Sequence, residues 1–317
     1  MSAPDETDPN VTAPLARFHG ERPPAPAWFA EAIAHAPERS FVPVEGAKIE
    51  LLTWGERGKP GLMLLHGGRA HADWFSFIAP FFADDYRVAA ISMSGMGRSD
   101  WRETYDIAQY GRELIAGATA AGLFEAAVAP VIVGHSFGSR PVLDVAARPN
   151  ISLRAAVVLD AAISPPDAPE MVFNPPRANW VYPSLPAALQ RFRLMPSQPC
   201  ENVYLLDHIA RESLKPVDTE DGREGWTWRF DPFQLHRLPD GVRAKADADL
   251  RAARCPLAFV RGDQSRIVQA ANLAYTRGVA PEGTVFASLP QAGHHLFLDQ
   301  PLAVVSTLRT LLAGWAR

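Results

Sequence analysis

The apolar residues of this chain fall into short runs that are typical of buried β-strands, separated by stretches in which apolar residues recur at helical spacing. The strand-like runs cover residues 41–44, 48–54, 61–65, 87–92, 128–133, 153–159, 256–260 and 284–288. The helical pattern covers residues 28–34, 107–121, 139–147 and 303–315. Strands that alternate with helices predict a mostly parallel sheet covered on both faces. We therefore expect an α/β fold with a mostly parallel eight-stranded sheet flanked by helices.

Two segments depart from this alternation. Prolines interrupt any regular element from about residue 163, and amphipathic stretches such as Val203 to Ile209 follow. This pattern predicts a helical cap over residues 163–250, inserted between the core segments 26–162 and 251–317. Residues 1–25 are polar and rich in proline and can bury little apolar surface, so we expect a mobile N-terminal arm there.

Composition narrows the range of partners. A net charge of −4 gives no basic surface for nucleic acid or an anionic membrane, and no apolar stretch is long enough to span a bilayer. The first residues lack the basic start and apolar core of a signal peptide. Cys200 and Cys255 are the two cysteines, and so few suggest reduced thiols. We expect a cytoplasmic protein that acts on a small molecule, while its oligomeric state stays open.

A candidate nucleophile lies between a predicted strand and a predicted helix. Residues 134–138 read Gly-His-Ser-Phe-Gly, the pattern G-x-S-x-G, with the strand at 128–133 before it and the helix at 139–147 after it. In this context the serine sits on a sharp turn with its oxygen above the sheet edge, and glycines avoid clashes beside it. The pattern predicts a nucleophilic Ser136; an ordinary glycine-rich turn is the alternative.

Two other turns supply partners for such a serine. His66-Gly67-Gly68-Arg69 follows the third strand, and the N–H groups of Gly68 and Phe137 are candidates for an oxyanion hole. Gly293-His294-His295 follows the last strand. An imidazole can take a serine proton and return it to a leaving group, so His294 is the candidate base. We expect His295 beside the base, and His66 and His135 to be packing residues.

The acid of the site has two candidates. Asp160 ends the sixth strand and Asp263 follows the seventh. Both lie between Ser136 and His294, in the chain order serine, acid, histidine. The residues alone leave the choice open.

From about residue 40 to the end, the chain resembles the α/β-hydrolase superfamily. The resemblance rests on His66-Gly67-Gly68, on residues 94–99 (Ser-Gly-Met-Gly-Arg-Ser), on residues 134–138 and on Gly293-His294 with Pro301 beyond. Many members carry the acid at the end of a Gly-x-x-Asp turn after the seventh strand, where this chain reads Gly262-Asp263-Gln264-Ser265. Other members carry it after the sixth strand, which matches Asp160. The resemblance therefore favours Asp160, with Asp263 as the alternative.

These residues predict a serine hydrolase that cleaves a carboxylic ester of a small or medium apolar substrate through an acyl-enzyme. Ser136 would attack, His294 would move the proton, and Asp160 would orient the imidazole. A serine nucleophile argues against the dehalogenases and epoxide hydrolases of the superfamily. No metal-ligand spacing or phosphate loop is visible, so we expect no cofactor.

Two alternatives remain for the function. The same kind of triad supports hydrolysis of a carbon–carbon bond in ring-cleavage products in similar families. A ligand-binding receptor with low turnover could keep the same fold. Aromatic residues of the predicted cap could line an apolar pocket for either a substrate or a ligand: Trp180, Trp226, Trp228, Phe230 and Phe233.

Overall fold

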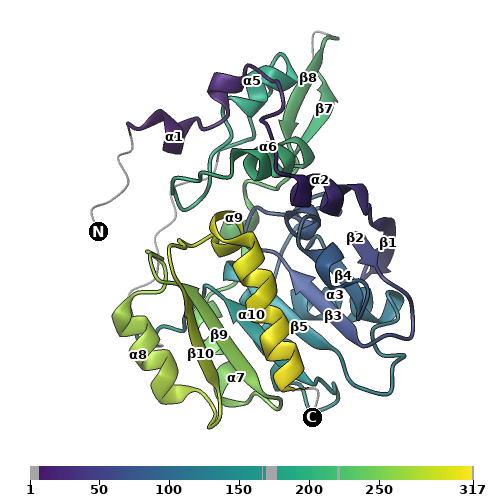
Figure 1. Cartoon of the computed structure of the whole chain (residues 1–317), viewed down its shortest axis with the longest axis vertical. Helices are drawn as coiled ribbons and strands as arrows, with labels where there is room; N and C mark the ends of the chain where they lie inside the picture. Colours follow the sequence, from purple (N-terminus) through teal and green to yellow (C-terminus); the bar gives the residue numbers. More distant parts are fainter. Residues whose placement is uncertain (1–6, 166, 169–176, 220–221, 316–317) are drawn as a thin grey trace.

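The structure is a computed structural model that describes residues 7–165, 167–168, 177–219 and 222–315. An eight-stranded sheet lies at its centre, with the strand order β1-β2-β4-β3-β5-β6-β9-β10 (Figure 1). The strands of this sheet are β1 (Glu38–Val44), β2 (Ala47–Trp54), β3 (Gly61–Leu65), β4 (Arg87–Ile91), β5 (Val131–His135), β6 (Ala155–Leu159), β9 (Leu257–Gly262) and β10 (Val285–Leu289). Strand β2 pairs antiparallel with β1 and β4, and the other pairs are parallel. The mostly parallel eight-stranded sheet is confirmed.

Helices cover both faces of this sheet. The helices of the described residues are α1 (Pro9–Thr12), α2 (Ala27–Ala34), α3 (Ile107–Ala120), α4 (Ser139–Ala147), α5 (Leu185–Leu189), α6 (Val203–Glu212), α7 (Val242–Arg251), α8 (Ala270–Val279), α9 (Leu296–Asp299) and α10 (Pro301–Gly314). Of these, α1, α5 and α6 lie apart from the sheet (Figure 1). Strand β3 shows why helices are needed on both faces of the sheet, because its side chains point alternately to one face and the other. Leu62 and Leu64 join one apolar cluster, which includes Leu308 of α10. Met63 and Leu65 join the other, with α3 and α4.

The segment predicted as a helical cap also contains strands. Besides α5 and α6, it holds β7 (Leu214–Asp218) and β8 (Glu224–Trp228), which form an antiparallel pair away from the main sheet (Figure 1). Helix α7 lies in the same predicted segment, yet its Ala246 and Leu250 belong to an apolar cluster of the core. The predicted boundary at residue 250 thus falls inside a helix that packs on the core.

The described part of the predicted N-terminal arm is packed against the protein. Leu15 is 2% exposed and joins the larger apolar cluster. The Arg211 side chain of α6 donates a hydrogen bond to the Gly20 carbonyl at 2.7 Å. Residues 7–25 therefore dock on the cap, because two apolar side chains, Val11 and Leu15, find buried positions. The first six residues of the predicted arm lie outside the described residues.

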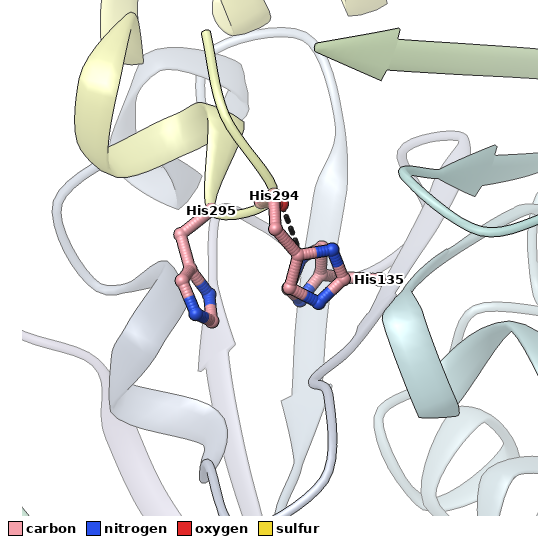
Figure 2. Close-up of side chains that lie close together, drawn as sticks. All are labelled: His135, His294 and His295. Atoms are coloured by element: carbon pink, nitrogen blue, oxygen red, sulfur yellow. Dashed lines mark hydrogen bonds between the residues drawn. The ribbon is translucent and has the colours of Figure 1, made fainter. Parts of the chain in front are cut away.

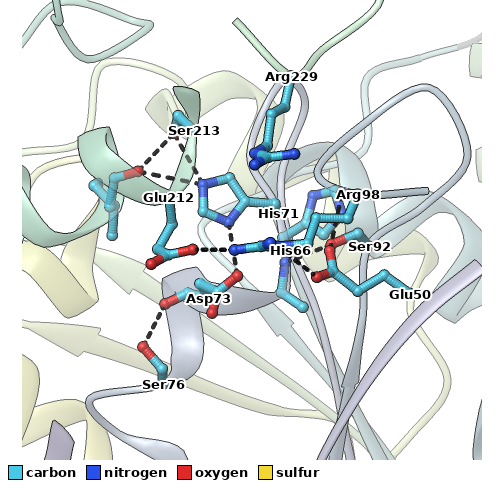
Figure 3. Close-up of polar contacts among 12 residues, drawn as sticks. Glu50, His66, His71, Asp73, Ser76, Ser92, Arg98, Glu212, Ser213 and Arg229 are labelled. Carbon is cyan, nitrogen blue, oxygen red and sulfur yellow. Dashed lines mark hydrogen bonds and ion pairs between the residues drawn. The ribbon is translucent and has the colours of Figure 1, made fainter. Parts of the chain in front are cut away.

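A group of charged and polar side chains joins the cap to the core (Figure 3). Glu50 on β2 is fully buried and forms ion pairs with Arg39 and Arg98. Arg98 also donates to Glu212 at the end of α6, at 2.7 Å. Close by, His71 Nε2 lies 2.9 Å from Ser213 Oγ. These contacts hold the end of α6 above the edge where the parallel strands end.

Two further features bear on the composition. Among the described residues, no helix is long and apolar enough to cross a membrane. Cys200 and Cys255 are both free thiols, as their small number suggested.

Candidate active site

Ser136 lies on a strained turn at the end of β5. Its φ is 50°, in the left-handed region that residues other than glycine rarely adopt. The chain can turn so sharply because glycines stand on either side. A Cβ at Gly134 would lie 2.6 Å from the Gly138 carbonyl oxygen, and one at Gly138 would lie 2.3 Å from the His66 carbonyl oxygen. Either side chain would collide with backbone, so the spacing of the motif follows from this close approach.

The structure brings Ser136, His294 and Asp160 into one chain of hydrogen bonds. His294 Nε2 lies 2.9 Å from Ser136 Oγ, and His294 Nδ1 lies 2.7 Å from Asp160 Oδ2. The three residues follow β5, β10 and β6, whose ends meet at the same edge of the sheet. His294 is 4% exposed and Asp160 is fully buried. The geometry allows a proton to pass from the hydroxyl to an imidazole that a carboxylate orients.

The Asp160 carboxylate accepts two further hydrogen bonds. Gly262 N–H donates to Oδ1 at 2.8 Å, and Ser265 Oγ donates to Oδ2 at 2.5 Å. Ser265 stands where many members of the superfamily carry their acid, and here its hydroxyl contacts the carboxylate of Asp160, the candidate acid after β6. Asp263 lies elsewhere: it is exposed, and its Oδ1 accepts from Ala292 N–H at 3.3 Å. Within the described part of the chain, no hydrogen bond links Asp263 to His294.

The glycine-rich turn after β3 lies against the turn of Ser136. A Cβ at Gly67 would lie 3.2 Å from Ser136 Cβ, and one at Gly68 would lie 3.7 Å from Phe137 Cβ. Phe137 belongs to a short 3-10 helix that leads directly into α4, and the first N–H groups of a helix have no partner within it. Both predicted oxyanion donors, the N–H groups of Gly68 and Phe137, therefore belong to turns that touch each other beside Ser136.

The rings of three histidines, His135, His294 and His295, pack together (Figure 2). The ring centroids of His135 and His294 are 4.9 Å apart, as are those of His294 and His295. Burial, and then the charge that His294 can carry, hold the pKa of both neighbours well below the usual value, so these rings are neutral. The predicted placement of His295 beside the base agrees with this arrangement.

The same three histidines could in principle bind a metal, because one ligand atom from each lies within 4.8 Å of the others. The donor set does not fit a resident ion. Both ring nitrogens of His294 already contact Ser136 and Asp160, and His135 Nε2 contacts the His294 carbonyl oxygen at 2.9 Å. A metal with three histidine ligands would have to break the contact of His294 with the serine or with the acid. The cluster therefore serves as packing for His294.

His66 is also a packing residue, as expected. Burial lowers its pKa to about 3, so its ring is neutral. Its Nε2 accepts a hydrogen bond from Met93 N–H at 3.0 Å and so joins the turns after β3 and β4.

The loop that carries His294 is held by residues that sequence reasoning missed. Asp299 accepts a hydrogen bond from Gly293 N–H at 2.7 Å, and burial raises the pKa of this carboxyl to about 6. Gln198, from the cap, donates to Asp299 and accepts from His295 N–H at 3.0 Å. No motif marks Gln198, because it lies about a hundred residues away in the sequence, among irregular segments.

The aromatic residues of the cap do not form a single lining. Trp180 is 69% exposed. Trp228 packs inside the cap, with its ring centroid 6.0 Å from that of Tyr182 and 6.1 Å from that of Phe192. Phe230 lies below the Arg69 guanidinium, 5.5 Å from the ring centroid. Phe230 thus contacts Arg69 of the glycine-rich turn.

Comparison with known proteins agrees with this architecture. The chain matches the model of the alpha/beta hydrolase family over residues 62–307 and belongs to that family. A 2-(acetamidomethylene)succinate hydrolase of Mesorhizobium japonicum is 26% identical over 261 residues, which cover 76% of this chain and 84% of the relative. An esterase of Mycobacterium tuberculosis is 24% identical over 277 residues, which cover 85% of this chain and 88% of the relative.

Solved structures show the same fold. The thioesterase domain from the curacin biosynthetic pathway has a TM-score of 0.70 to this chain at 20% identity, over 86% of this chain and 99% of that domain. The superfamily expected from the motifs is confirmed, and the protein is a hydrolase of this family.

Proposed function

We propose that the protein is a serine hydrolase that cleaves a carboxylic ester through an acyl-enzyme. The observation that carries the proposal is the chain of hydrogen bonds from Ser136 Oγ through His294 to Asp160. Ser136 and Asp160 lie directly after strands of one sheet, and His294 lies on the loop after a third strand of it, where it bonds to both, so their relative positions are fixed before a substrate arrives.

In the first half of the reaction, Ser136 Oγ attacks the acyl carbon and its proton passes to His294 Nε2. The negative charge that forms on the carbonyl oxygen is held by the N–H groups of Gly68 and Phe137. His294 then gives its proton to the leaving alcohol, which departs and leaves the acyl group on the serine oxygen. In the second half, water attacks the acyl carbon while His294 removes one of its protons. The bond from the acyl carbon to Ser136 Oγ then breaks, His294 returns the proton to Oγ, and the carboxylic acid departs.

Asp160 stabilises the imidazolium that exists between these proton transfers. The neighbouring rings of His135 and His295 are neutral, so they neither repel nor compensate this charge strongly. The carboxylate at 2.7 Å from Nδ1 is the group that both fixes the tautomer and balances the charge.

The similarity to the esterase of M. tuberculosis supports ester hydrolysis. The similarity to the 2-(acetamidomethylene)succinate hydrolase favours a second candidate, hydrolysis of a bond that is not a simple ester. Cleavage of a carbon–carbon bond belongs to the same alternative. Turnover of a vinylogous diketone but not of aryl esters would select it.

A panel of p-nitrophenyl esters of increasing acyl length tests the proposal and measures the acyl pocket. We expect turnover by the parent protein and its loss by several orders of magnitude in Ser136→Ala, because the nucleophile is removed. Ser139→Ala is the matched control: Ser139 Oγ donates to the Gly134 carbonyl in the same turn and takes no part in the reaction. Near-parental activity of Ser136→Ala would end the serine-hydrolase proposal.

A further inference from the structure

Arg69 occupies a backbone position that favours glycine. The Ala70 N–H donates to the Gly67 carbonyl at 3.3 Å, which closes a tight turn over residues 67–70. Arg69 is the third residue of this turn and has a φ of 60°. Glycine is the usual residue at such a position because it lacks a Cβ. An arginine at this position strains the backbone, and residues with strained backbone cluster at functional sites.

The turn also brings Arg69 next to the nucleophile. Gly67 approaches Ser136, Gly68 approaches Phe137, and Arg69 follows directly in the sequence. The residue is exposed to solvent, and its guanidinium lies 5.5 Å from the centre of the Phe230 ring of the cap. The side chain is therefore held at the junction of the cap and the two catalytic turns, and a ligand can reach it.

The Arg69 guanidinium has no counter-ion among the residues that the structure describes. Arg69 forms no ion pair with the described carboxylates, whereas Arg39, Arg98 and Arg102 each pair with an acid. Burial alone lowers its pKa. The buried acid of the site is not available to it, because Asp160 already accepts hydrogen bonds from His294, Gly262 and Ser265.

A partly desolvated cation that has an aromatic ring but no described carboxylate beside it gains when an anion binds to it. The planar guanidinium carries two parallel N–H groups that match the two oxygens of a carboxylate, and such charge-assisted pairs are stronger than neutral hydrogen bonds. A single fork suits one carboxylate better than a phosphate dianion, which calls for more donors.

We propose that Arg69 binds a carboxylate carried by the substrate, so that the protein acts on esters with an apolar body and a free carboxylate. This inference rests on the proposed ester hydrolysis and refines it, because the substrate is then not wholly apolar. Arg69 is a specificity-determining residue: it anchors one end of the substrate while the ester carbonyl reaches Ser136.

Matched pairs of substrates test this role by turnover. One pair is 4-acetoxybenzoate and its methyl ester, and the other is monoethyl glutarate and diethyl glutarate; the carboxylate lies on the alcohol side in the first pair and on the acyl side in the second. We expect kcat/KM of the parent protein to favour the anionic member of at least one pair. Arg69→Gln should lower that preference by about tenfold or more and leave the neutral member nearly unchanged, because a hydrogen bond to a charged group is lost.

Three further variants separate the role of the charge from other effects. Arg69→Lys should keep part of the preference. Arg69→Gly relieves the positive φ and should lose the preference, so a loss cannot be attributed to a distorted turn. Arg229→Gln is the matched control: Arg229 adjoins Phe230 in the sequence but lines a cavity of about 350 Å³ with Arg98 and Lys215, and Arg69 is not among the residues that line it. It should behave as the parent protein does. An unchanged preference in Arg69→Gln and Arg69→Gly overturns the proposal.

A binding measurement tests Arg69 without turnover. Glutarate and 4-hydroxybenzoate are titrated by calorimetry into Ser136→Ala protein and into the same protein with Arg69→Gln added. We expect at least one of them to bind, with affinity about tenfold or more weaker in the second protein. Equal affinities, or no binding to either protein, overturn the role of Arg69. If the parent hydrolyses no ester but this difference is found, ester hydrolysis fails while the anion site stands.

Discussion

Replacing Asp160 by asparagine is the most informative single change in the site. Three donors surround the carboxylate, namely His294 Nδ1–H, Gly262 N–H and the Ser265 hydroxyl. Asparagine has nearly the same shape but offers one acceptor oxygen and one NH₂ donor. The amide must therefore place its NH₂ group against at least one of these donors, in a position that is fully buried.

Both orientations of the amide are unfavourable. If NH₂ faces His294 Nδ1, the imidazole must carry its proton on Nε2 and can no longer accept the proton of Ser136. If the oxygen faces His294, NH₂ meets the Gly262 N–H at close range, and the unsatisfied buried groups cost about 1–3 kcal/mol. We expect kcat of Asp160→Asn to fall by about three to four orders of magnitude, which is about 4–5.5 kcal/mol of transition-state stabilisation.

Asp263→Asn is the control that the chain itself provides. Asp263 is exposed, and its carboxylate accepts a single hydrogen bond at 3.3 Å from the Ala292 N–H. Its kcat should stay within about threefold of the parent value, since surface substitutions have small effects. The assay is steady-state hydrolysis of p-nitrophenyl acetate, with circular dichroism to check that both variants fold.

Two outcomes would refute this reasoning. A large loss in Asp263→Asn with little change in Asp160→Asn would move the acid to the strand β9. Moderate and similar losses in both variants would mean that the two carboxylates share the role, so that neither single assignment holds.

Further predictions concern the base, its support and the buried rings. His294→Ala should lose nearly as much kcat as Ser136→Ala, whereas His295→Ala should be mild; a greater loss at His295 would change the assignment of the base. Ser265→Ala should lower kcat about tenfold with little change in KM, because the acid loses a charge-assisted hydrogen bond, and Ser265→Thr should restore part of it; an unchanged kcat would refute this role. The free energy of unfolding, measured with urea, should fall between about pH 7.5 and 5.5. In the folded protein the buried histidines stay neutral below their ordinary pKa of 6.5, while the same histidines of the unfolded chain take up protons. Their contribution to the free energy of unfolding is therefore complete above that pKa and is lost as the pH falls. His295→Gln should weaken this dependence, and an unaltered slope would contradict it.

The sheet could be predicted from the sequence because each buried strand is a local apolar run. Some strands were predicted to start too early: β5 begins at Val131 and β6 at Ala155, and Val128 is 41% exposed. Apolar character alone does not tell the end of a strand from an exposed loop that precedes it. The turns at Gly68, Ser136 and His294 could be predicted because glycine at fixed spacing is itself the cause of the turn.

The choice between the two candidate acids and the structure of the cap could not be predicted, because both depend on contacts between residues that lie far apart in the sequence. Asp160 and Asp263 both follow a buried strand, and local pattern cannot separate them. The lateral order of the sheet does, because β6 lies between β5 and β9 and its end adjoins both the serine turn and the turn that contains Ser265. In the cap, the pairing of β7 with β8 was missed because Pro216 lies within a strand, where proline is unusual.

The positive φ angles of Ser136 and Asp160 serve the function of this protein but lower the stability of its fold. Each left-handed residue costs about 1–2 kcal/mol relative to ordinary backbone, and glycine would remove most of that penalty. Glycine would also remove the hydroxyl or the carboxylate. At position 160 glycine would leave the buried donors of Gly262 and Ser265 without an acceptor, which offsets the backbone gain. A library selected for heat resistance alone would therefore enrich glycine at position 136 and fill with inactive proteins, so stabilising this scaffold requires that every round of selection also demand turnover.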